Sequence, residues 1–314
     1  MTTGGEGAGA VLIAGPTASG KSALAVRLAE RLGGVVVNAD SMQVYAELTI
    51  LTARPSAADE ARVPHRLYGH VPAARAHSVA EWLADVAPVL AELRAAGRPA
   101  IVVGGTGLYF EALTRGLAEV PAIPDEIRAH WRARAAAEGA PALHGELARR
   151  DPVGAARLEP GDSQRITRAL EVIDATGRPL AAWQAGPRPA PLVRPETALR
   201  LIVEPERAVL HARIEARLRQ MMGEGAIEEA ARFAALGLDP ALPATRAIGV
   251  SALARVAAGE IDAARGLELA IFETRQYAKR QSTWLRGRMG DWTRVDAAFD
   301  QSPSLAALER AGRP

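Results

Sequence analysis

Eight consecutive residues near the start of the chain have the spacing of a phosphate-binding loop. They are Gly15, Pro16, Thr17, Ala18, Ser19, Gly20, Lys21 and Ser22. An apolar run over 11–14 precedes them and a helical pattern over 21–32 follows, which is the strand–loop–helix context that this spacing requires. Backbone N–H groups of such a loop, together with the N-terminus of its helix, surround phosphate oxygens. The segment therefore predicts a binding site for a di- or triphosphate.

The last two residues of this loop have side chains suited to phosphate and metal. Lys21 can place a compact ammonium group against phosphate oxygens. Of the 38 basic residues in the chain, only Lys21 and Lys279 are lysines, so a lysine at this position indicates a point contact that a guanidinium does not replace. The Ser22 hydroxyl can ligate a Mg²⁺ ion that the phosphates also hold. We therefore expect Mg²⁺ as the cofactor and Ser22 as its ligand.

Two further polar residues follow the next predicted strands. Asp40 comes shortly after the apolar run 34–38, and Thr106 follows the run 100–103 and two glycines. Carboxyl ends of parallel strands meet at the ligand-binding edge of a sheet, so both residues are expected near the phosphate loop. Asp40 could ligate Mg²⁺ through water, accept a proton, or cap the turn that follows it. The segment at Thr106 carries no acid, which argues against simple phosphoryl transfer.

A fourth candidate, Arg217, lies on a predicted helix. An apolar stripe at helical spacing runs along this helix through Leu210, Ile214, Leu218 and Met221. Arg217 projects within about 20° of Leu210, so its guanidinium lies at the edge of the stripe. Because burying an unpaired guanidinium is costly, Arg217 should face either a bound anion or an internal carboxylate. These arguments indicate Asp40, Thr106 and Arg217 as candidate catalytic residues.

The surrounding sequence predicts the elements that position these residues. Apolar strands are expected over 11–14, 34–38, 100–103 and 199–203. Helices are expected over 21–32, 78–96, 205–236, 248–258 and 266–286. Near-continuous apolar strands that alternate with helices indicate an α/β fold, in which a parallel sheet is covered by helices on both faces.

The sequence changes character between residues 121 and 195. This stretch is rich in arginine and alanine, helical in pattern, and broken by Gly161, Gly177 and the prolines over 187–195. It is predicted to be a helical insertion domain. The core would then consist of residues 1–120 and 196–314, with the insertion between its two parts.

Bulk composition excludes several classes of protein. The chain is 48% hydrophobic and 24% charged, with a net charge of +2, so a nucleic-acid partner must be bound by local basic patches. It has no cysteine, which excludes disulfides, thiolate metal sites and cysteine nucleophiles. No apolar run reaches membrane-spanning length and no leader pattern begins the chain, so the cytoplasm is the expected compartment.

Two segments outside the phosphate loop combine cations with polar side chains. Over 162–170, helical projection places Gln164, Arg165 and Arg168 on the side opposite Ile166. The segment 274–288 holds five cations, two aromatic residues and no acid. Cations interleaved with glutamine and aromatic rings suit a phosphate backbone with stacked or hydrogen-bonded bases. A solvated arginine face is the other interpretation of each segment.

Taken together, these segments resemble the tRNA dimethylallyltransferase family. The resemblance extends from Gly15 to Arg286, and its blocks follow the order that the family has. They are the phosphate loop 15–22 and the segments 40–45, 52–55, 64–67, 104–109, 164–172, 246–249 and 274–286. The chain departs from the family pattern at Leu51, Gly69 and Val250, where glycine, aspartate and tyrosine are usual.

The resemblance implies transfer of a dimethylallyl group from dimethylallyl diphosphate to N6 of an adenosine in tRNA. That adenosine follows the anticodon on its 3′ side, in tRNAs that read codons beginning with U. The phosphate loop and Arg217 would hold the departing diphosphate, Asp40 would act as general base, and Thr17 and Thr106 would orient the reactants. The implied partners are the tRNA anticodon stem-loop and dimethylallyl diphosphate, without a membrane, and a monomer would suffice.

The resemblance also implies which residues contact tRNA. The target base would leave the anticodon-loop stack to enter the pocket, while the insertion domain grips the stem-loop. The implied contact residues are Asp40, Ser41, Met42, Gln43, Thr106, Arg128, Gln164, Arg165, Ile166, Thr167, Arg168, Arg246, Ala247, Ile248, Gly249, Arg275, Lys279 and Arg280.

Three other functions fit part of the sequence. A small-molecule kinase that uses ATP would share the phosphate loop, but it has no need of the two basic segments. An isopentenyltransferase acting on free AMP, ADP or ATP would share the core, but it has less use for an RNA-gripping insertion. A non-catalytic RNA-binding protein with a nucleotide switch would not depend on Asp40 as a base. Assays of phosphoryl transfer and of an Asp40→Asn variant distinguish these alternatives.

Overall fold

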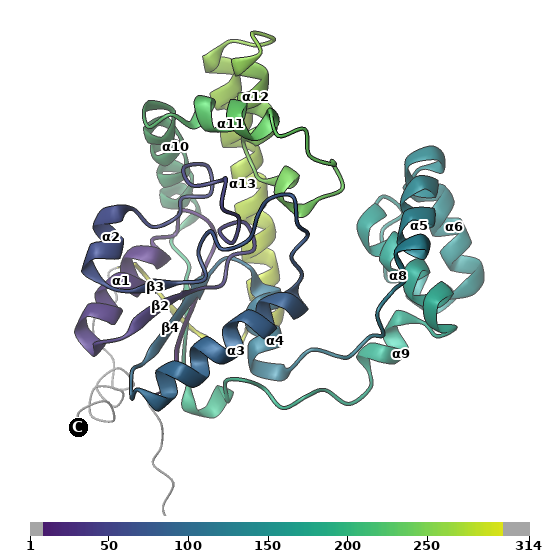
Figure 1. Cartoon of the computed structure of the whole chain (residues 1–314), viewed down its shortest axis with the longest axis horizontal. Coiled ribbons are helices and arrows are strands. Elements are labelled where there is room, and N and C mark those ends of the chain that lie inside the picture. The colour runs from purple at the N-terminus through teal and green to yellow at the C-terminus, as the bar shows by residue number, and fades with distance from the viewer. Residues whose placement is uncertain (1–8, 298–314) are drawn as a thin grey trace, which may run out of the picture. The chain divides into compact units, whose positions relative to one another are not determined.

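The computed structural model describes residues 9–297 of the 314-residue chain, and its strands form a parallel sheet (Figure 1). The sheet has six strands in the order β3-β2-β4-β1-β5-β6, and every neighbouring pair is parallel. The strands are β1 (Val11–Ala14), β2 (Val35–Asn38), β3 (His65–Arg66), β4 (Ala100–Gly104), β5 (Leu199–Val203) and β6 (Thr293–Val295). The predicted α/β fold is therefore confirmed.

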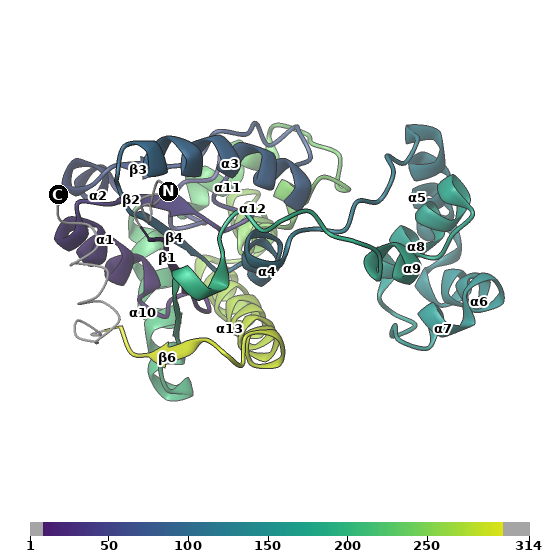
Figure 2. The ribbon, with the colours of Figure 1, turned by 90° about the horizontal axis from the view of Figure 1, so that it is seen from below.

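Helices cover both faces of this sheet. The helices that begin outside residues 115–190 are α1 (Lys21–Leu32), α2 (Ala57–Arg62), α3 (Val79–Ala95), α4 (Gly107–Arg115), α10 (Arg207–Gly223), α11 (Ala226–Ala234), α12 (Val250–Ala257) and α13 (Ala263–Arg288). In Figure 2, α3 runs along one side of the strands, and α13 and α10 lie toward the other. Short 3₁₀ turns occur at Pro195–Thr197 and Pro243–Arg246.

Alternate strand residues build two separate hydrophobic cores, one on each face. In β1, Leu12 belongs to the core that includes Trp82 of α3 and Phe110 of α4. Its neighbour Ile13 belongs to the core that includes Leu24 of α1. Side chains on a strand alternate between faces, so a run of apolar residues is required where both faces are buried. This explains why β1, β2 and β4 lack the polar alternation of an exposed strand.

The chain divides into two compact units. The core unit contains the described residues up to Thr114 and those from Pro191 onward, and the second unit spans Arg115–Ala190. The second unit consists of α5 (Asp125–Glu138), α6 (Ala140–Arg150), α7 (Pro152–Ala155), α8 (Ser163–Thr176) and α9 (Leu180–Gln184). The structure thus divides the chain at 115 and 190, whereas the sequence indicated 121 and 195.

The second unit has a hydrophobic core of its own. Trp131 of α5, Leu143 of α6 and Leu170 of α8 are almost fully buried and pack together. The Trp131 indole N–H donates a hydrogen bond to Asp174 Oδ2 at 2.6 Å, which satisfies the polar atom of this buried ring. Because the core is internal to residues 115–190, these helices form a packing unit rather than an extended surface loop.

Several elements differ from the sequence-based expectation. The helical region predicted over 205–236 is interrupted after Gly223, and Gly225 adopts a φ of +98° before α11 begins. This left-handed conformation favours glycine and ends the preceding helix. The strand predicted over 100–103 is β4, which ends one residue later, at Gly104. The strand β6, at Thr293–Val295, was not predicted from the sequence and extends the sheet.

Within residues 9–297, none of the helices combines the length and the apolar character needed to cross a membrane.

Candidate active site

The phosphate loop connects the end of β1 to the start of α1, as the sequence predicts. Gly15 has no room for a side chain, because a Cβ there would lie 2.7 Å from the carbonyl oxygen of Val203. Gly20 has a φ of +96° and precedes α1 directly. The loop thus turns sharply between strand and helix, and it directs the helix N-terminus toward the edge of the sheet where β2 and β4 also end. This geometry suits an anion site, which the eight-residue pattern predicts.

Lys21 is the positively charged group at the centre of the loop. Its Nζ donates a hydrogen bond to the carbonyl oxygen of Pro16 at 3.2 Å. Burial lowers the pKa of Lys21 to about 8, while the negative charge of Asp40 raises it and the positive charge of Arg217 lowers it further. These three side chains, which are far apart in sequence, therefore lie close enough to influence one another's charge.

The lowered pKa of Lys21 predicts a pH-dependent affinity for diphosphate. Lys21 is charged below a pH of about 8 and loses its proton above it. A bound anion favours the charged form, so binding above that pH must take up a proton and the affinity should fall by up to about tenfold per pH unit. Calorimetric titration with inorganic diphosphate between about pH 7 and 9 measures this slope. Lys21→Met should lack it, and the same slope in both proteins would contradict the assignment.

Arg217 on α10 contacts the phosphate loop directly. Its Nη2 donates a hydrogen bond to Thr17 Oγ1 at 2.5 Å. Its Nε is buried and has no hydrogen-bond partner within residues 9–297, and no carboxylate in that range forms an ion pair with it. Burial lowers the pKa of Arg217, and the charge of Asp40 partly offsets this effect. A buried guanidinium with an unsatisfied donor indicates an anion site, which favours the first of the two predicted interpretations.

Asp40 follows β2 and uses its two carboxylate oxygens differently. Oδ1 accepts a hydrogen bond from the Met42 N–H at 3.0 Å, so it stabilises the following turn. Oδ2 faces Gly105, where an added Cβ would lie 3.2 Å from it. The backbone of Asp40 is fixed by Asn38, whose Oδ1 accepts from the Asp40 N–H at 2.8 Å. The turn-capping interpretation is thus correct for one oxygen, and the other remains available for chemistry.

Thr106 joins the ends of β2 and β4. Its Oγ1 accepts a hydrogen bond from the Ser41 N–H at 2.9 Å and donates to Ser41 Oγ at 3.2 Å. Gly104 permits this close approach, since a Cβ there would lie 2.0 Å from the carbonyl oxygen of Ala39. The Thr106 hydroxyl therefore holds the Asp40 turn against the glycine segment, and Thr17, Asp40, Thr106, Arg217 and Lys21 all belong to the core unit.

The structure adds Gln281 of α13 to the site, a residue that was not among the predicted site residues. Its side chain is buried, with an exposed fraction of 6%. Oε1 accepts from the Thr17 N–H at 2.8 Å, and Nε2 donates to the carbonyl oxygen of Gly105 at 2.9 Å. The amide therefore bridges the phosphate loop and the segment after β4. Tyr277, one turn earlier, lies close enough to Asp40 for that charge to raise its pKa, with burial as the larger cause.

The two hydrogen bonds of Gln281 predict a loss of diphosphate affinity when they are removed. Gln281→Ala should weaken the binding of inorganic diphosphate by up to about 30-fold, because each of the two lost hydrogen bonds contributes about 1 kcal/mol. Gln281→Glu should bind more weakly still, since it adds a negative charge and no longer donates to Gly105. Gln276→Ala, exposed on the same helix, is the matched control for calorimetric titration. Unchanged affinity in both Gln281 variants would exclude the bridging role.

The remaining predicted tRNA-contact residues of the core unit differ in their exposure. Arg246, Lys279 and Arg280 are exposed, and the Arg280 guanidinium lies 5.7 Å from the centroid of the Tyr277 ring. Arg275 is partly buried and pairs with Glu215 at 3.1 Å. Met42 and Ile248 are partly buried, and Ala247 and Gly249 are buried. Gln43 Nε2 donates to the carbonyl oxygens of Thr52 and Ala53 at 2.9 and 2.8 Å.

The predicted contact residues of the second unit divide between its surface and its core. Gln164 and Arg165 are exposed at the start of α8. Arg168 is partly exposed, and its Nη1 lies 3.4 Å from Glu171 Oε2. Ile166 and Thr167 are buried, with exposed fractions of 0% and 9%, so they belong to the core of this unit rather than to a contact surface. Arg128 lies on α5, and its Nη1 is 4.0 Å from Asp125 Oδ1. Its Nε is buried and has no hydrogen-bond partner within residues 9–297.

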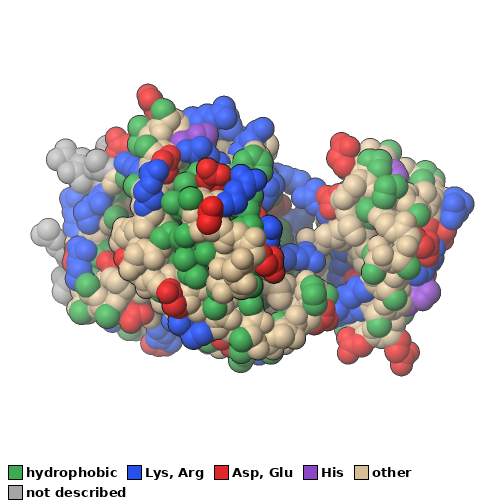
Figure 3. Space-filling view, turned by 90° about the horizontal axis from the view of Figure 1, so that it is seen from above, with side chains coloured by type: hydrophobic (Ala, Val, Ile, Leu, Met, Phe, Trp, Pro, Cys, Tyr) green, Lys and Arg blue, Asp and Glu red, His purple; other side chains and the backbone are tan. Residues whose placement is uncertain are grey.

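Charged side chains of both signs are distributed over the protein surface. Figure 3 shows basic side chains interspersed with acidic and apolar ones on the face drawn. This agrees with a net charge of only +2. A polyanionic partner would therefore be recognised through particular arginines and lysines and not through a uniform positive field.

Comparison with known proteins places this site in a family. Residues 43–288 match the family model described as IPP transferase, and residues 8–70 match that described as isopentenyl transferase. The tRNA dimethylallyltransferase of Agrobacterium fabrum is 55% identical over 287 residues, which cover 91% of this chain and 96% of that protein. The tRNA dimethylallyltransferase of Bradyrhizobium sp. (strain ORS 278) is 55% identical over 291 residues, 92% of this chain and 94% of that protein.

Solved structures give the same assignment. The tRNA isopentenylpyrophosphate transferase of Bacillus halodurans has a TM-score of 0.66 and 32% identity, over 96% of this chain and 95% of that one. A eukaryotic dimethylallyltransferase acting on tRNA has a TM-score of 0.78 over 95% of this chain and 77% of that one, and its 24% identity shows the shared fold. The IPP transferase model spans most of the chain, and relatives 55% identical cover nine-tenths of it. The chain therefore belongs to the IPP transferase family, as its sequence blocks predict.

Proposed function

We propose that this enzyme transfers the dimethylallyl group of dimethylallyl diphosphate to N6 of the tRNA adenosine that follows the anticodon on its 3′ side. The observation that supports this most directly is the arrangement around the phosphate loop. Lys21 and Arg217 provide two cations, and Asp40 provides a carboxylate whose charge acts on both of them. A diphosphate site with an adjacent base suits a reaction in which the diphosphate departs and the acceptor loses a proton.

The proposed reaction exchanges one bond for another at the allylic carbon. The C–O bond to the diphosphate breaks while adenine N6 forms a bond to the same carbon, and the N6 proton passes to Asp40. Negative charge grows on the departing diphosphate, where Lys21, the loop amides and the unsatisfied Nε of Arg217 would stabilise it. The exocyclic amine is a weak nucleophile, because its lone pair is delocalised into the ring. A carboxylate that accepts its proton therefore lowers the barrier.

The residues present also fit a magnesium ion at the diphosphate. Ser22 is exposed at the first turn of α1, next to Lys21, so its hydroxyl is available to a metal that phosphate oxygens also ligate. We propose Ser22 as the protein ligand of this ion. Bound Mg²⁺ would neutralise part of the diphosphate charge.

The proposed acceptor is tRNA rather than a free nucleotide. The relatives and the solved structures are described as enzymes that act on tRNA. This chain adds exposed cations on α13, at Lys279 and Arg280, and on α8, at Arg165. These side chains would contact phosphates of the anticodon stem-loop, while the flipped adenine enters beside Asp40. A kinase is not favoured, since the segment after β4 presents Gly105 and Thr106 and no carboxylate.

Incubation with dimethylallyl diphosphate, Mg²⁺ and unmodified tRNA, followed by digestion to nucleosides and mass analysis, tests the proposal. A mass gain of one five-carbon unit on adenosine is expected. A mutant tRNA in which guanosine replaces the adenosine after the anticodon should gain nothing. Modification of free AMP at a comparable rate, or modification of that mutant tRNA, would contradict the proposed acceptor.

A further inference from the structure

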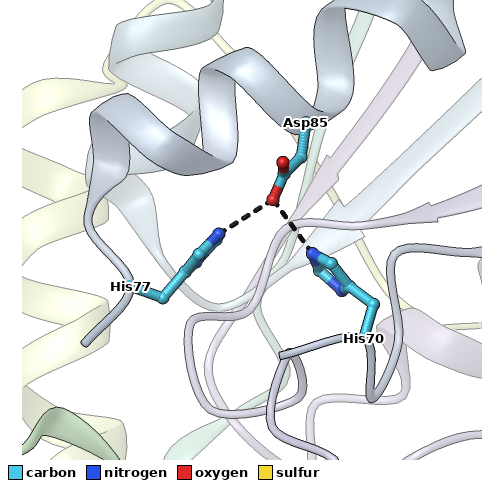
Figure 4. A group of neighbouring side chains, drawn as sticks. All are labelled: His70, His77 and Asp85. Carbon is cyan, nitrogen blue, oxygen red and sulfur yellow. Dashed lines mark hydrogen bonds and ion pairs between the residues drawn. The ribbon is translucent and has the colours of Figure 1, made fainter. Parts of the chain in front are cut away.

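Two histidines and an aspartate of the core unit lie close together and point toward one another (Figure 4). His70 Nε2 lies 3.0 Å from Asp85 Oδ2, and His77 Nε2 lies 2.9 Å from the same oxygen. One ligand atom from each residue lies within 4.8 Å of the other two. The imidazole rings meet edge to face, with centroids 5.6 Å apart at an angle of 88°. Neither the phosphate loop nor the proposed chemistry uses these side chains.

We propose that His70, His77 and Asp85 form a binding site for a divalent transition-metal ion, with Zn²⁺ as the representative ion. Two imidazoles and a carboxylate are a donor set that Zn²⁺ accepts, with a water molecule as the fourth ligand. Mg²⁺ prefers oxygen ligands and an octahedral arrangement, so this site is distinct in kind from the diphosphate-bound Mg²⁺ site.

Two of the three separations between the donor atoms, those from each histidine nitrogen to Asp85 Oδ2, are close to those of a tetrahedral site. Metal–ligand bonds of about 2.0–2.1 Å place neighbouring ligands of a tetrahedral ion about 3.3 Å apart. The two nitrogen–oxygen distances of 2.9 and 3.0 Å need to open by only a few tenths of an ångström to reach that spacing. The two imidazole nitrogens lie within 4.8 Å of each other and must approach to the same spacing, which the partly exposed His70 side chain allows. The ion would replace the protons that now bridge the three side chains.

The backbone of each ligand is anchored independently of the metal. His77 directly precedes Ser78, the N-cap of α3, whose side chain and Glu81 form a capping box. Asp85 lies on α3 itself, and His70 precedes Val71, whose N–H donates to the carbonyl oxygen of Val44 at 2.9 Å. Anchored ligands lose little conformational freedom on binding, so the site is preorganised.

The three proposed ligands differ in how far their side chains are exposed to solvent, and an accessible metal site needs at least one exposed ligand. The His77 side chain is 1% exposed, and its Nδ1 has no hydrogen-bond partner in the described part of the chain, so its hydrogen bond to Asp85 is made through Nε2. The side chains of His70 and Asp85 are 29% and 38% exposed. One ligand is therefore fixed inside the protein, while the other two face solvent and leave a path for the ion and its bound water.

A metal at this position would connect the segment 70–77 to α3 and thus steady the strand end that carries Asp40. Trp82, on the same helix, donates its indole N–H to the carbonyl oxygen of Asn38 at 2.9 Å and stacks on Tyr109. Asn38 in turn donates to the carbonyl oxygen of Asp40 at 3.0 Å. The ion would act on stability through this chain of contacts and would not take part in the chemistry.

Titration of the metal-free full-length protein with ZnCl₂ tests the proposal. The protein should carry no polyhistidine tag, and saturating Mg²⁺ and diphosphate should occupy the phosphate loop. We expect one Zn²⁺ per chain with a dissociation constant of about 1 µM or tighter, and a rise in the melting temperature on binding. Absence of saturable one-to-one binding would overturn the proposal.

Variants then locate the bound ion. Asp85→Asn keeps an acceptor for both histidines but loses the charge, so it should fold normally and bind Zn²⁺ at least about 100-fold more weakly. His70→Gln should do the same, whereas His130→Asn, an exposed histidine of α5, should bind as the wild type does. Circular dichroism checks the folding of each variant. Wild-type affinity in either Asp85→Asn or His70→Gln would overturn the site, as would equal loss in His130→Asn.

Discussion

Asp40→Asn should reduce the rate of dimethylallyl transfer by about 10²–10⁴-fold while tRNA binding is retained. Asparagine has nearly the same shape and can still accept the hydrogen bond that the Met42 N–H donates to Oδ1. The variant therefore keeps the turn but loses the group that takes up the N6 proton. Single-turnover kinetics with saturating substrates measure the chemical step, and filter binding measures the affinity for tRNA.

A matched variant separates this effect from a general change of charge. Asp239→Asn replaces an exposed aspartate whose Oδ1 likewise accepts from a nearby backbone N–H, that of Ala241, at 2.8 Å. It should transfer at the wild-type rate. If Asp40→Asn also transferred at that rate, Asp40 would not be the general base. If it lost tRNA binding in proportion to rate, the residue would act in binding alone.

Lys21→Met should lower the rate of transfer by roughly 10²–10³-fold, because an oriented cation at the departing diphosphate is lost. The affinity for inorganic diphosphate should fall as well. Lys21→Arg should recover little of the activity, since a planar guanidinium does not fit where a compact ammonium group donates to the Pro16 carbonyl oxygen. Transfer kinetics and calorimetric titration measure the two effects.

Two comparisons make the Lys21 result specific. Arg27→Met changes an exposed cation on the same helix and should leave both quantities unchanged. Lys279→Met removes the other lysine of the chain, which we assign to tRNA contact, so it should weaken tRNA binding without altering diphosphate affinity. Full activity in Lys21→Met would show that the loop does not stabilise the leaving group.

The parts of the site that could be predicted from the sequence are those encoded by neighbouring residues. The phosphate loop occupies eight consecutive positions, and its strand and helix were predicted with the bounds that the structure shows, Val11–Ala14 and Lys21–Leu32. The placement of Asp40 beside the loop followed from its position at the end of a parallel strand, and its charge acts on Lys21 as expected.

The parts that could not be predicted depend on contacts between distant segments. Gln281 lies 264 positions from Thr17, and its role arises only because α13 packs against the phosphate loop. Gln281 belongs to the basic segment 274–288, whose composition suggested contact with nucleic acid. The sequence therefore did not indicate that its side chain bridges the phosphate loop and Gly105. Ile166 and Thr167 were grouped with their exposed neighbours by the resemblance, although helical periodicity already places Ile166 on the apolar side of α8.

Short or irregular elements were also missed for a physical reason. The strand β6 has three residues, and it forms because β5 offers a free edge for pairing, with Leu201 opposite Thr293. Helix α10 ends near Gly225 because of a left-handed residue that a helical pattern over 205–236 does not reveal. Both outcomes depend on backbone geometry more than on the hydrophobic pattern.

The most direct test of the proposed chemistry follows both halves of the donor in one reaction. Dimethylallyl diphosphate with tritium in the hydrocarbon and ³²P in the diphosphate would be incubated with the enzyme, Mg²⁺ and unmodified tRNA. Our account predicts tritium in adenosine of the tRNA and an equal amount of ³²P as free inorganic diphosphate. Recovery of ³²P in the tRNA, or tritium left in the donor while ATP is consumed, would contradict it.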